Sequence, residues 1–122
     1  RSVLKQAYPS GANIDDALVN LLYQPTQRDG AAEAFRGFIN LFDDHLAPQL
    51  MGNLTVPVDL IWGEKDPWEP LAGAKNWAET IPTVRSLQVI TGAGHCPHDE
   101  APEMVNQQLL RRVQEHASAA PD

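Results

Sequence analysis

The apolar positions in the first part of the chain recur at helical spacing. In residues 13–24 they return every three or four positions, Asn13 stands where a helix N-cap is expected, and Pro25 ends the segment. A second helical pattern begins at Ala31 and closes before Pro48. Its apolar stripe comprises Ala31, Phe35, Phe38, Ile39 and Phe42, followed by Asp43 and Asp44. We therefore expect two amphipathic helices before any strand, with the phenylalanine stripe packed in the core.

The pattern then changes from helical to strand-like. Residues 56–62 are short, rich in β-branched and aromatic side chains and almost continuously apolar, which is typical of a strand covered on both faces. Residues 86–90 form a second such segment, and a helical pattern ended by Pro82 separates the two. The apolar face of that helix comprises Leu71, Ala74, Trp77, Ala78 and Ile81. A strand–helix–strand unit joins parallel strands, so the loops after Trp62 and Ile90 should meet at one sheet edge.

The last apolar pattern begins at Pro102, a residue suited to a first helical turn, and continues to Val113 along one helix face. Residues 118–122 are expected to be frayed. The chain therefore divides into a helical part, residues 1–50, an α/β part, residues 51–117, and this short tail.

Composition narrows the possible partners. A chain of 122 residues with 43% apolar residues fits one globular domain. The formal net charge of −7, without clustered lysine or arginine, argues against nucleic-acid and anionic-membrane surfaces and favours a small neutral or apolar ligand. No apolar run approaches the roughly 18 residues that span a bilayer, so we expect a soluble protein without a transmembrane segment. A single cysteine leaves the redox compartment open.

Two chemically rich loops should converge at the sheet edge. Asp66 follows the first strand in "GEKDPWEP", and His95 follows the second in "GAGHCPHDEAP". A histidine that acts as a general base needs a carboxylate to hold its tautomer and to stabilise the imidazolium that forms. Asp66 and His95 are therefore the candidate catalytic pair, and Trp68 is a candidate for lining an apolar substrate pocket.

Other interpretations of these side chains remain. His95 can be a turn histidine satisfied by the backbone, and Asp66 a solvated turn acid or a cap for the helix after Pro70. Asp59 is a rival acid, but it lies inside the strand, away from the sheet edge. The other acids are expected to be solvated or to cap helices: Asp43, Asp44, Asp99 and Glu100.

A metal site is a further alternative for the histidine loop. The loop holds enough ligand types, in His95, Cys96, His98, Asp99 and Glu100. Adjacent side chains point apart, however, and no second cluster completes the shell expected of structural zinc. We expect no metal and no cofactor, and we interpret Cys96 as a small buried side chain rather than a nucleophile.

The turn Gly63-Glu64-Lys65-Asp66, "G-x-x-D", and the turn "G-x-G-H" that ends at His95 resemble the acid and histidine turns of the α/β-hydrolase family. Within that family, "DPW" and "GHCPHDEAPE" look most like the pheophytinase-like branch of serine esterases. The resemblance implies an α/β fold class: the C-terminal fragment of an α/β-hydrolase, with its last two parallel strands. It implies that residues 1–50 are the end of a helical lid and that residues 51–117 carry the acid and histidine loops. A cytoplasmic or plastid-like compartment would suit such a protein.

The family's nucleophile has no counterpart in this sequence. The serines are Ser2, Ser10, Ser86 and Ser118, and none lies in a G-x-S-x-G turn between a strand and a helix. We therefore expect a missing N-terminal half of the same fold to supply a serine, and hydrolysis of a bulky apolar ester through a Ser-Asp-His triad. If the nucleophile is an aspartate, the family resemblance implies a haloalkane dehalogenase instead.

A non-catalytic chain is the second hypothesis. The 122 residues alone are expected to be inactive, as a truncated product or as a fragment that pairs with another chain, because two strands make a marginal sheet with an unpaired edge. A small stand-alone binding module is the third, and it would need the N-terminal helices to cover that edge.

Overall fold

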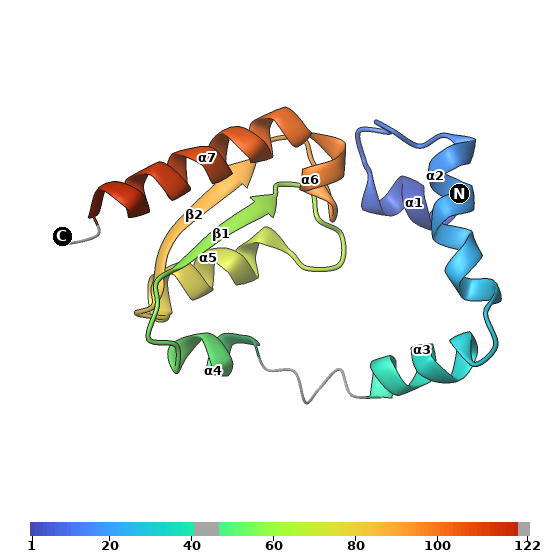
Figure 1. Ribbon diagram of the computed structural model, residues 1–122, viewed down its shortest axis with the longest axis horizontal. Coiled ribbons are helices and arrows are strands. Elements are labelled where there is room, and N and C mark those ends of the chain that lie inside the picture. Colours follow the sequence, from blue (N-terminus) through green and yellow to red (C-terminus); the bar gives the residue numbers. More distant parts are fainter. Residues whose placement is uncertain (41–46, 120–122) are drawn as a thin grey trace.

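Strand, helix and strand follow one another in the order that the hydrophobic pattern predicts. The computed structural model describes residues 1–40 and 47–119. Its strands are β1 (Val58–Gly63) and β2 (Val84–Ile90). Its helices, shown in Figure 1, are α1 (Ser2–Ala7), α2 (Asp16–Tyr23), the 3-10 helix η1 (Gln24–Gln27), α3 (Ala31–Asn40), α4 (Ala47–Gly52), α5 (Leu71–Thr80), α6 (Pro97–Glu100) and α7 (Pro102–Ala119).

The two strands are parallel, as the crossover rule requires. Their register runs from Asp59 beside Ser86 to Gly63 beside Ile90. β1 starts two positions later than the sequence predicts, at the first residue after Pro57, because proline has no N–H to give to a ladder. The first ladder bond is instead donated by the N–H of Val58 to the carbonyl of Thr83, at 2.8 Å. The α/β fold class is thus confirmed.

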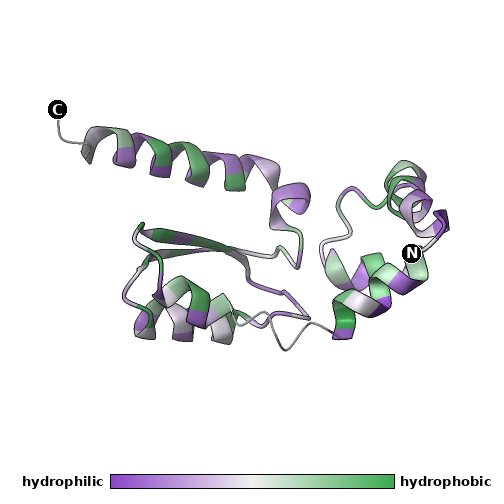
Figure 2. Ribbon diagram, turned by 60° about the horizontal axis from the view of Figure 1, so that its bottom comes forward, coloured by the Kyte–Doolittle hydropathy of each residue, from purple (hydrophilic) through white to green (hydrophobic). Residues whose placement is uncertain are grey.

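Helices cover the two faces of the sheet. α5 packs against both strands on one face and α7 against both strands on the other (Figures 1 and 2). The predicted apolar face of α5 is confirmed, because Ala74 is fully buried and Ile81 nearly so. On the α7 side the core consists of Ile90, Ala93 and Val105. Ala93 belongs to the loop that carries the candidate histidine, so this core anchors that loop.

The N-cap of α2 lies two residues beyond the predicted one. Asp15 is its N-cap, and the Asp15 side chain accepts the N–H of Leu18 at 2.8 Å. The prediction that Asn13 caps this helix is wrong, since Asn13 has a φ of 63° in the left-handed region, where asparagine is tolerated. Its side-chain amide instead donates to the backbone carbonyl of Asp99 at 2.5 Å.

The phenylalanine stripe of α3 is not buried in a core, contrary to the sequence prediction. Phe35 is 65% exposed, Phe38 55% and Ile39 51%. The reason is the position of α3, which packs against η1 and lies apart from the sheet (Figure 1). The predicted end of the stripe and its stop signals, Phe42, Asp43 and Asp44, lie outside the described residues.

β1 is covered on its faces but less completely than the sequence predicts. Its residues from Val58 to Trp62 are only half-buried. Within the described parts of the chain the sheet has two strands, so no third strand lies along the outer edge of β1. Among the described elements, the main contacts of β1 are with β2, α5 and α7 rather than with the N-terminal helices. The edge that a stand-alone binding module would need to cover is therefore open here.

Three short α-helices, α1, α4 and α6, and the 3-10 helix η1 were not predicted from the sequence. The longest of them has six residues, too few for an apolar period to stand out. Among residues 1–40 and 47–119, no helix combines the length and apolar character that crossing a membrane requires. The division of the chain at residue 50 into a lid and a core stays a prediction.

Candidate functional site

The loops that follow β1 and β2 meet, as parallel strands require. The N–H of Lys65 donates to the carbonyl of Ala93 at 2.8 Å, and the N–H of Glu64 to that of Ile90 at 3.1 Å. The Glu64 carboxylate accepts the N–H of Gly92 at 2.8 Å. These bonds hold the acid-bearing loop against the histidine-bearing loop.

The contact between the loops leaves no room for a side chain at Gly63. A Cβ built at this residue would overlap the backbone carbonyls of Gly94 and Ala93. The first glycine of the "G-x-x-D" turn is therefore needed for close approach of two backbones rather than for a special φ.

Asp66 and His95 face each other across this junction. His95 Nδ1 lies 3.0 Å from Asp66 Oδ2 and 3.1 Å from Asp66 Oδ1. The Asp66 side chain is only 6% exposed, and that of His95 is 37% exposed. A buried acid beside a partly exposed imidazole is the arrangement in which the acid orients the ring while the ring can still meet a substrate.

The acid is fixed by its own turn. Asp66 Oδ1 accepts the backbone N–H groups of Trp68 and Glu69, both at 3.0 Å. It does not cap α5, whose N-cap is Pro70. The alternative that Asp66 is a solvated acid or a helix cap is thus wrong, because its carboxylate is buried and shared between its turn and His95.

The acid turn is in turn anchored to the core by Trp62. The indole Nε1–H of Trp62 donates to the carbonyl of Glu69 at 2.8 Å. The Trp62 ring packs edge-to-face on Trp77 of α5, with centroids 5.6 Å apart. The last residues of β1 and the crossover helix therefore set the position of Asp66.

A small hollow opens beside the pair. It has a volume of about 160 Å³ and is lined by Ile61, Trp62, Gly63, Asp66, Glu69, His95 and Pro97. Trp68 does not belong to this lining. Its ring instead lies against the His95 ring, with centroids 4.7 Å apart and planes at 70°, and its side chain is 45% exposed. The structure therefore brings the three predicted site residues together, with Trp68 as a neighbour of the histidine ring.

Glu100 is the residue whose environment differs most from the one predicted from the sequence. The prediction that it is solvated or a cap is wrong, since it is 8% exposed. Its Oε2 accepts the N–H of Gly94 at 2.6 Å, and its Oε1 accepts the N–H of Ser10 at 2.8 Å. The Ser10 hydroxyl also donates to Oε1. Ser10 and Glu100 are separated by 90 positions, so no local pattern could have indicated their contact.

Asp99 is likewise engaged with the N-terminal segment. Its Oδ2 accepts the hydroxyl of Tyr8 at 2.8 Å, and Tyr8 is 5% exposed. Burial raises the pKa of the Tyr8 hydroxyl well above its usual range, and the hydrogen bond to Asp99 and the proximity of Cys96 raise it further. Tyr8 therefore stays a protonated donor at neutral pH. Cys96 is half-buried, and in the described residues no group of three or more His, Cys, Asp or Glu side chains could hold a metal ion.

The rival acid Asp59 lies inside β1, as predicted, and has its own partners. It pairs with Arg85, accepts the Ser86 hydroxyl and lies 3.4 Å from His116 Nε2. Burial alone would raise the pKa of Asp59, but the hydrogen bonds from Ser86, Arg85 and His116 outweigh it and lower that pKa. Through His116, Asp59 thus links α7 to the sheet, and it takes no part in the contact between Asp66 and His95.

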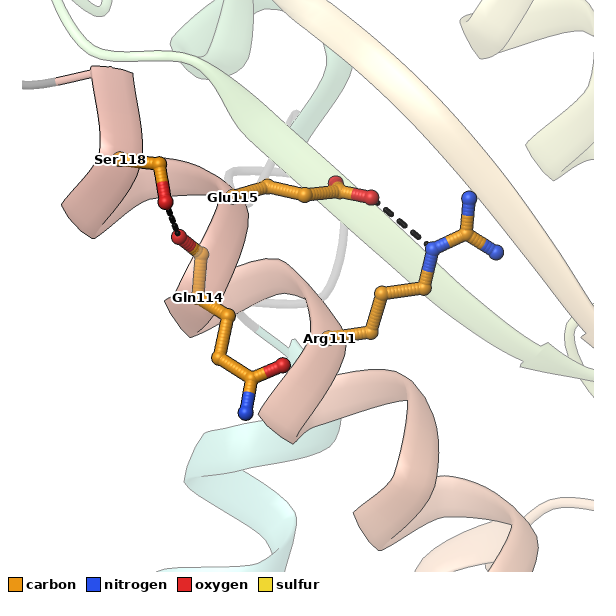
Figure 3. A pocket seen from close by; sticks show the side chains of 4 residues that line it. All are labelled: Arg111, Gln114, Glu115 and Ser118. Carbon is orange, nitrogen blue, oxygen red and sulfur yellow. Dashed lines mark hydrogen bonds and ion pairs between the residues drawn. The ribbon is translucent and has the colours of Figure 1, made fainter.

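A larger hollow, of about 420 Å³, lies on the surface of α7 and is unsuited to catalysis (Figure 3). Its lining comes from α7 alone: Arg111, Gln114, Glu115 and Ser118. Arg111 pairs with Glu115 at 2.9 Å, and the Ser118 hydroxyl donates to the Gln114 carbonyl at 2.9 Å. These are ordinary helix-surface pairs four residues apart.

Comparison with known proteins points to hydrolases. The chain is 35% identical over 111 residues to "Pheophytinase, chloroplastic" of Arabidopsis thaliana, an alignment that covers 85% of this chain and 22% of that protein. It is 26% identical over 96 residues to the uncharacterised hydrolase YugF of Bacillus subtilis (strain 168), with 79% of this chain and 35% of that protein covered. No family model matches the chain, and no solved structure matches it significantly.

The resemblance that the two turns predict is therefore confirmed, at the level of distant similarity over most of this chain. The chain spans 22% and 35% of the lengths of these two relatives.

Proposed function

We propose that this chain, a distant relative of the α/β-hydrolases, supplies the acid and the histidine of a carboxylic ester hydrolase, with Asp66 orienting His95 as the general base. The observation that carries the proposal is the 3.0 Å contact between His95 Nδ1 and the buried carboxylate of Asp66. It lies at the carboxyl ends of two parallel strands, which is where α/β folds place their sites.

The contact supports one assignment of roles to the two ring nitrogens of His95. With Nδ1 facing Asp66, Nε2 of His95 is the nitrogen that takes a proton from the nucleophile. As a serine Oγ bonds to the ester carbonyl carbon, its proton moves to Nε2, and His95 then gives that proton to the departing alcohol as the C–O bond breaks. Water next attacks the acyl-enzyme, His95 accepts its proton, and the carboxylic acid leaves as the serine recovers the proton. The Asp66 carboxylate stabilises each imidazolium.

The nucleophile is proposed to come from outside this chain. The four serines of the sequence lie outside any G-x-S-x-G turn, and a strained strand-to-helix turn is what presents a serine to the histidine in this family. The donors of an oxyanion hole are proposed to lie there too. The missing partner would pair with the open edge of β1, because that edge has no described strand beside it.

A bulky apolar ester is the proposed substrate class. The similarity to a protein named pheophytinase supports it, as do the local motifs "DPW" and "GHCPHDEAPE". The apolar side chains exposed on α3, Phe35 and Ile39 among them, are consistent with a substrate-facing lid, and the net charge of −7 suits a neutral ligand better than an anionic one.

The proposal is tested by expressing the whole open reading frame that contains this chain and measuring hydrolysis of p-nitrophenyl acetate, p-nitrophenyl palmitate and a phytyl ester. We expect turnover of the long-chain esters and stoichiometric labelling by a fluorophosphonate, both abolished by His95→Ala. Turnover that is unchanged in His95→Ala would refute the assignment. Esterase activity that is absent, together with halide release from haloalkanes, would indicate an aspartate nucleophile instead.

A further inference from the structure

We propose that Glu100 is a positioning residue for His95 and that the segment from Ala7 to Asn13 holds Glu100 in place. The proposal rests on the proposed function, since it concerns the same histidine. It differs from the Asp66 contact because Glu100 acts on the backbone before His95 rather than on the imidazole ring.

The carboxylate of Glu100 joins two parts of the chain. One oxygen, Oε2, accepts the N–H of Gly94, the residue directly before His95, at 2.6 Å. The other, Oε1, accepts the backbone N–H of Ser10 at 2.8 Å and the Ser10 hydroxyl. Glu100 is 8% exposed, so these donors replace the water that a carboxylate would otherwise keep.

The same segment also binds the histidine directly. The backbone N–H of His95 donates to the carbonyl of Ala7 at 2.8 Å. Gly94 lies so close to this segment that a Cβ there would overlap the Ala7 carbonyl and the Pro9 ring. Gly94 and His95 thus contact both the Glu100 carboxylate and the segment from Ala7 to Pro9.

Two more hydrogen bonds fix the turn that carries Glu100. The Tyr8 hydroxyl donates to Asp99 Oδ2 at 2.8 Å, and the Asn13 amide donates to the Asp99 carbonyl at 2.5 Å. α6 has only four residues, too few for a helix that is stable by itself, so its position depends on its contacts with neighbouring segments. The N-terminal segment therefore serves as the template on which the histidine loop is ordered.

A charged acceptor suits this junction better than a neutral one. Each of the two Glu100 oxygens accepts a donor from a different segment, whereas the side chain of glutamine has one oxygen acceptor and a donating NH₂ group. Glu100→Gln therefore has to leave either Gly94 or Ser10 without an acceptor. Removal of one partner of a buried hydrogen bond is costly because the other partner stays dehydrated.

The test compares Glu100→Gln and Glu100→Ala with Glu103→Gln, an exposed glutamate three residues further along the chain. Amide hydrogen exchange is followed by mass spectrometry in three segments: residues 8–12, residues 91–96 and residues 58–63 of β1. We expect the Glu100 variants to exchange at least tenfold faster in the first two segments, with β1 unchanged. Glu103→Gln should leave all three segments as in the wild type. Equal acceleration in β1 would mean general destabilisation and would overturn the proposal, as would unchanged exchange in residues 91–96.

A second experiment measures the chemical reactivity of His95. Diethylpyrocarbonate modifies imidazoles, and His116, 44% exposed at the far end of the sheet, is an internal reference in the same sample. We expect the ratio of His95 to His116 modification to change at least threefold in Glu100→Gln and not in Glu103→Gln. An unchanged ratio overturns the proposal whether or not the protein is a hydrolase.

Activity links the contact to catalysis. In the esterase assay of the whole protein, Glu100→Gln should lower kcat at least tenfold with KM within twofold, while Glu103→Gln retains wild-type kcat. If the Glu100 variants do not fold, Ser10→Ala replaces them, with an expected threefold acceleration of exchange in residues 91–96. An active enzyme whose kcat is insensitive to Glu100→Gln would refute the positioning role. An inactive wild type would count against the proposed function only, because the exchange and modification arms still decide whether Glu100 orients His95.

Discussion

Asp66 and His95 are 29 positions apart in the chain, yet His95 Nδ1 lies 3.0 Å from Asp66 Oδ2. The crossover through α5 makes this contact possible, since it returns the chain to the same sheet edge. The Trp68 ring also lies against the His95 imidazole. The imidazole is therefore in contact with the Asp66 carboxylate and with an aromatic ring at the same time.

Asp66→Asn tests whether catalysis needs the carboxylate of Asp66. In the active whole protein it should lower kcat by about 10⁴-fold, because an amide at this position favours the wrong histidine tautomer. Asp59→Asn is the control: it is the same substitution at an acid inside β1, the strand that leads to the Asp66 loop, and this acid pairs with Arg85 rather than with His95. It should keep kcat within a factor of two. Equal losses in both variants would assign the effect to stability rather than to catalysis.

Asp59 should govern stability in acid. Its hydrogen bonds from Ser86, Arg85 and His116 lower the pKa of the folded state below the value of the unfolded chain, against the opposing effect of burial. The stabilisation is therefore complete above the unfolded pKa, near 4, and is lost as the pH falls through the lower, folded pKa. Asp59→Asn should reduce the free energy of unfolding by about 2 kcal/mol at pH 7. Urea titrations at pH 7 and pH 3 check this, and a difference that does not shrink at pH 3 would contradict it.

Gly63→Ala should destabilise the protein because its Cβ would overlap the carbonyls of the histidine loop. We expect a loss of about 2 to 3 kcal/mol in the free energy of unfolding. Gly73→Ala in α5 is the control, since its Cβ would meet nothing within 4 Å and alanine favours helix by about 0.5 to 1 kcal/mol. Thermal unfolding of both variants should therefore shift in opposite directions. A stabilised Gly63→Ala would mean that the two loops are not in contact.

Tyr8→Phe should weaken the attachment of the N-terminal segment. The loss of the hydroxyl bond to Asp99 is expected to cost about 1 kcal/mol, whereas Tyr23→Phe, at a side chain that is 59% exposed, should cost nothing measurable. Because burial and then Asp99 raise the pKa of Tyr8, its contribution is present below the unfolded tyrosine pKa, near 10, and declines above it. Denaturant unfolding at pH 8 and pH 11 measures both effects. Equal costs for the two tyrosines would argue against the Tyr8–Asp99 bond.

The chain by itself should be marginal and should self-associate. The outer edge of β1 has no partner strand among the described residues, and Phe35 and Ile39 are exposed on α3. Sedimentation at increasing concentration should show dimers or larger species, and Phe35→Ser with Ile39→Ser should reduce them, with Arg36→Ala as the control. A monomer with a sharp cooperative melt would contradict this expectation.

Much of the α/β part could be predicted from sequence because its signals are local. The strand pattern, the face of α5 and Pro102 at the start of α7 each depend on neighbours within a few positions. The parallel direction of the two strands then followed from the helical crossover between them, and it brought Asp66 and His95 to one sheet edge. The pairing of the acid with the histidine was therefore predictable from the sequence alone.

The rest depended on distant contacts. The burial of Glu100 depends on Ser10, 90 positions away, and the exposure of the α3 stripe depends on where α3 lies relative to the sheet. An amphipathic pattern predicts that a helix has an apolar face, but it does not say which surface that face meets. The prediction of Asn13 as an N-cap was wrong for a related reason. Its side chain donates a hydrogen bond to Asp99, which is distant in the sequence.

The length of α7 has a practical consequence. The helix begins just after the histidine loop and has 18 residues, so it extends about 27 Å along its axis. Near its far end His116 reaches Asp59, at the opposite end of the strands from His95. A fluorophore or a surface linkage at Ser118 would therefore lie about a full helix length from the imidazole, and it would report on or immobilise the protein while leaving the approach to His95 open.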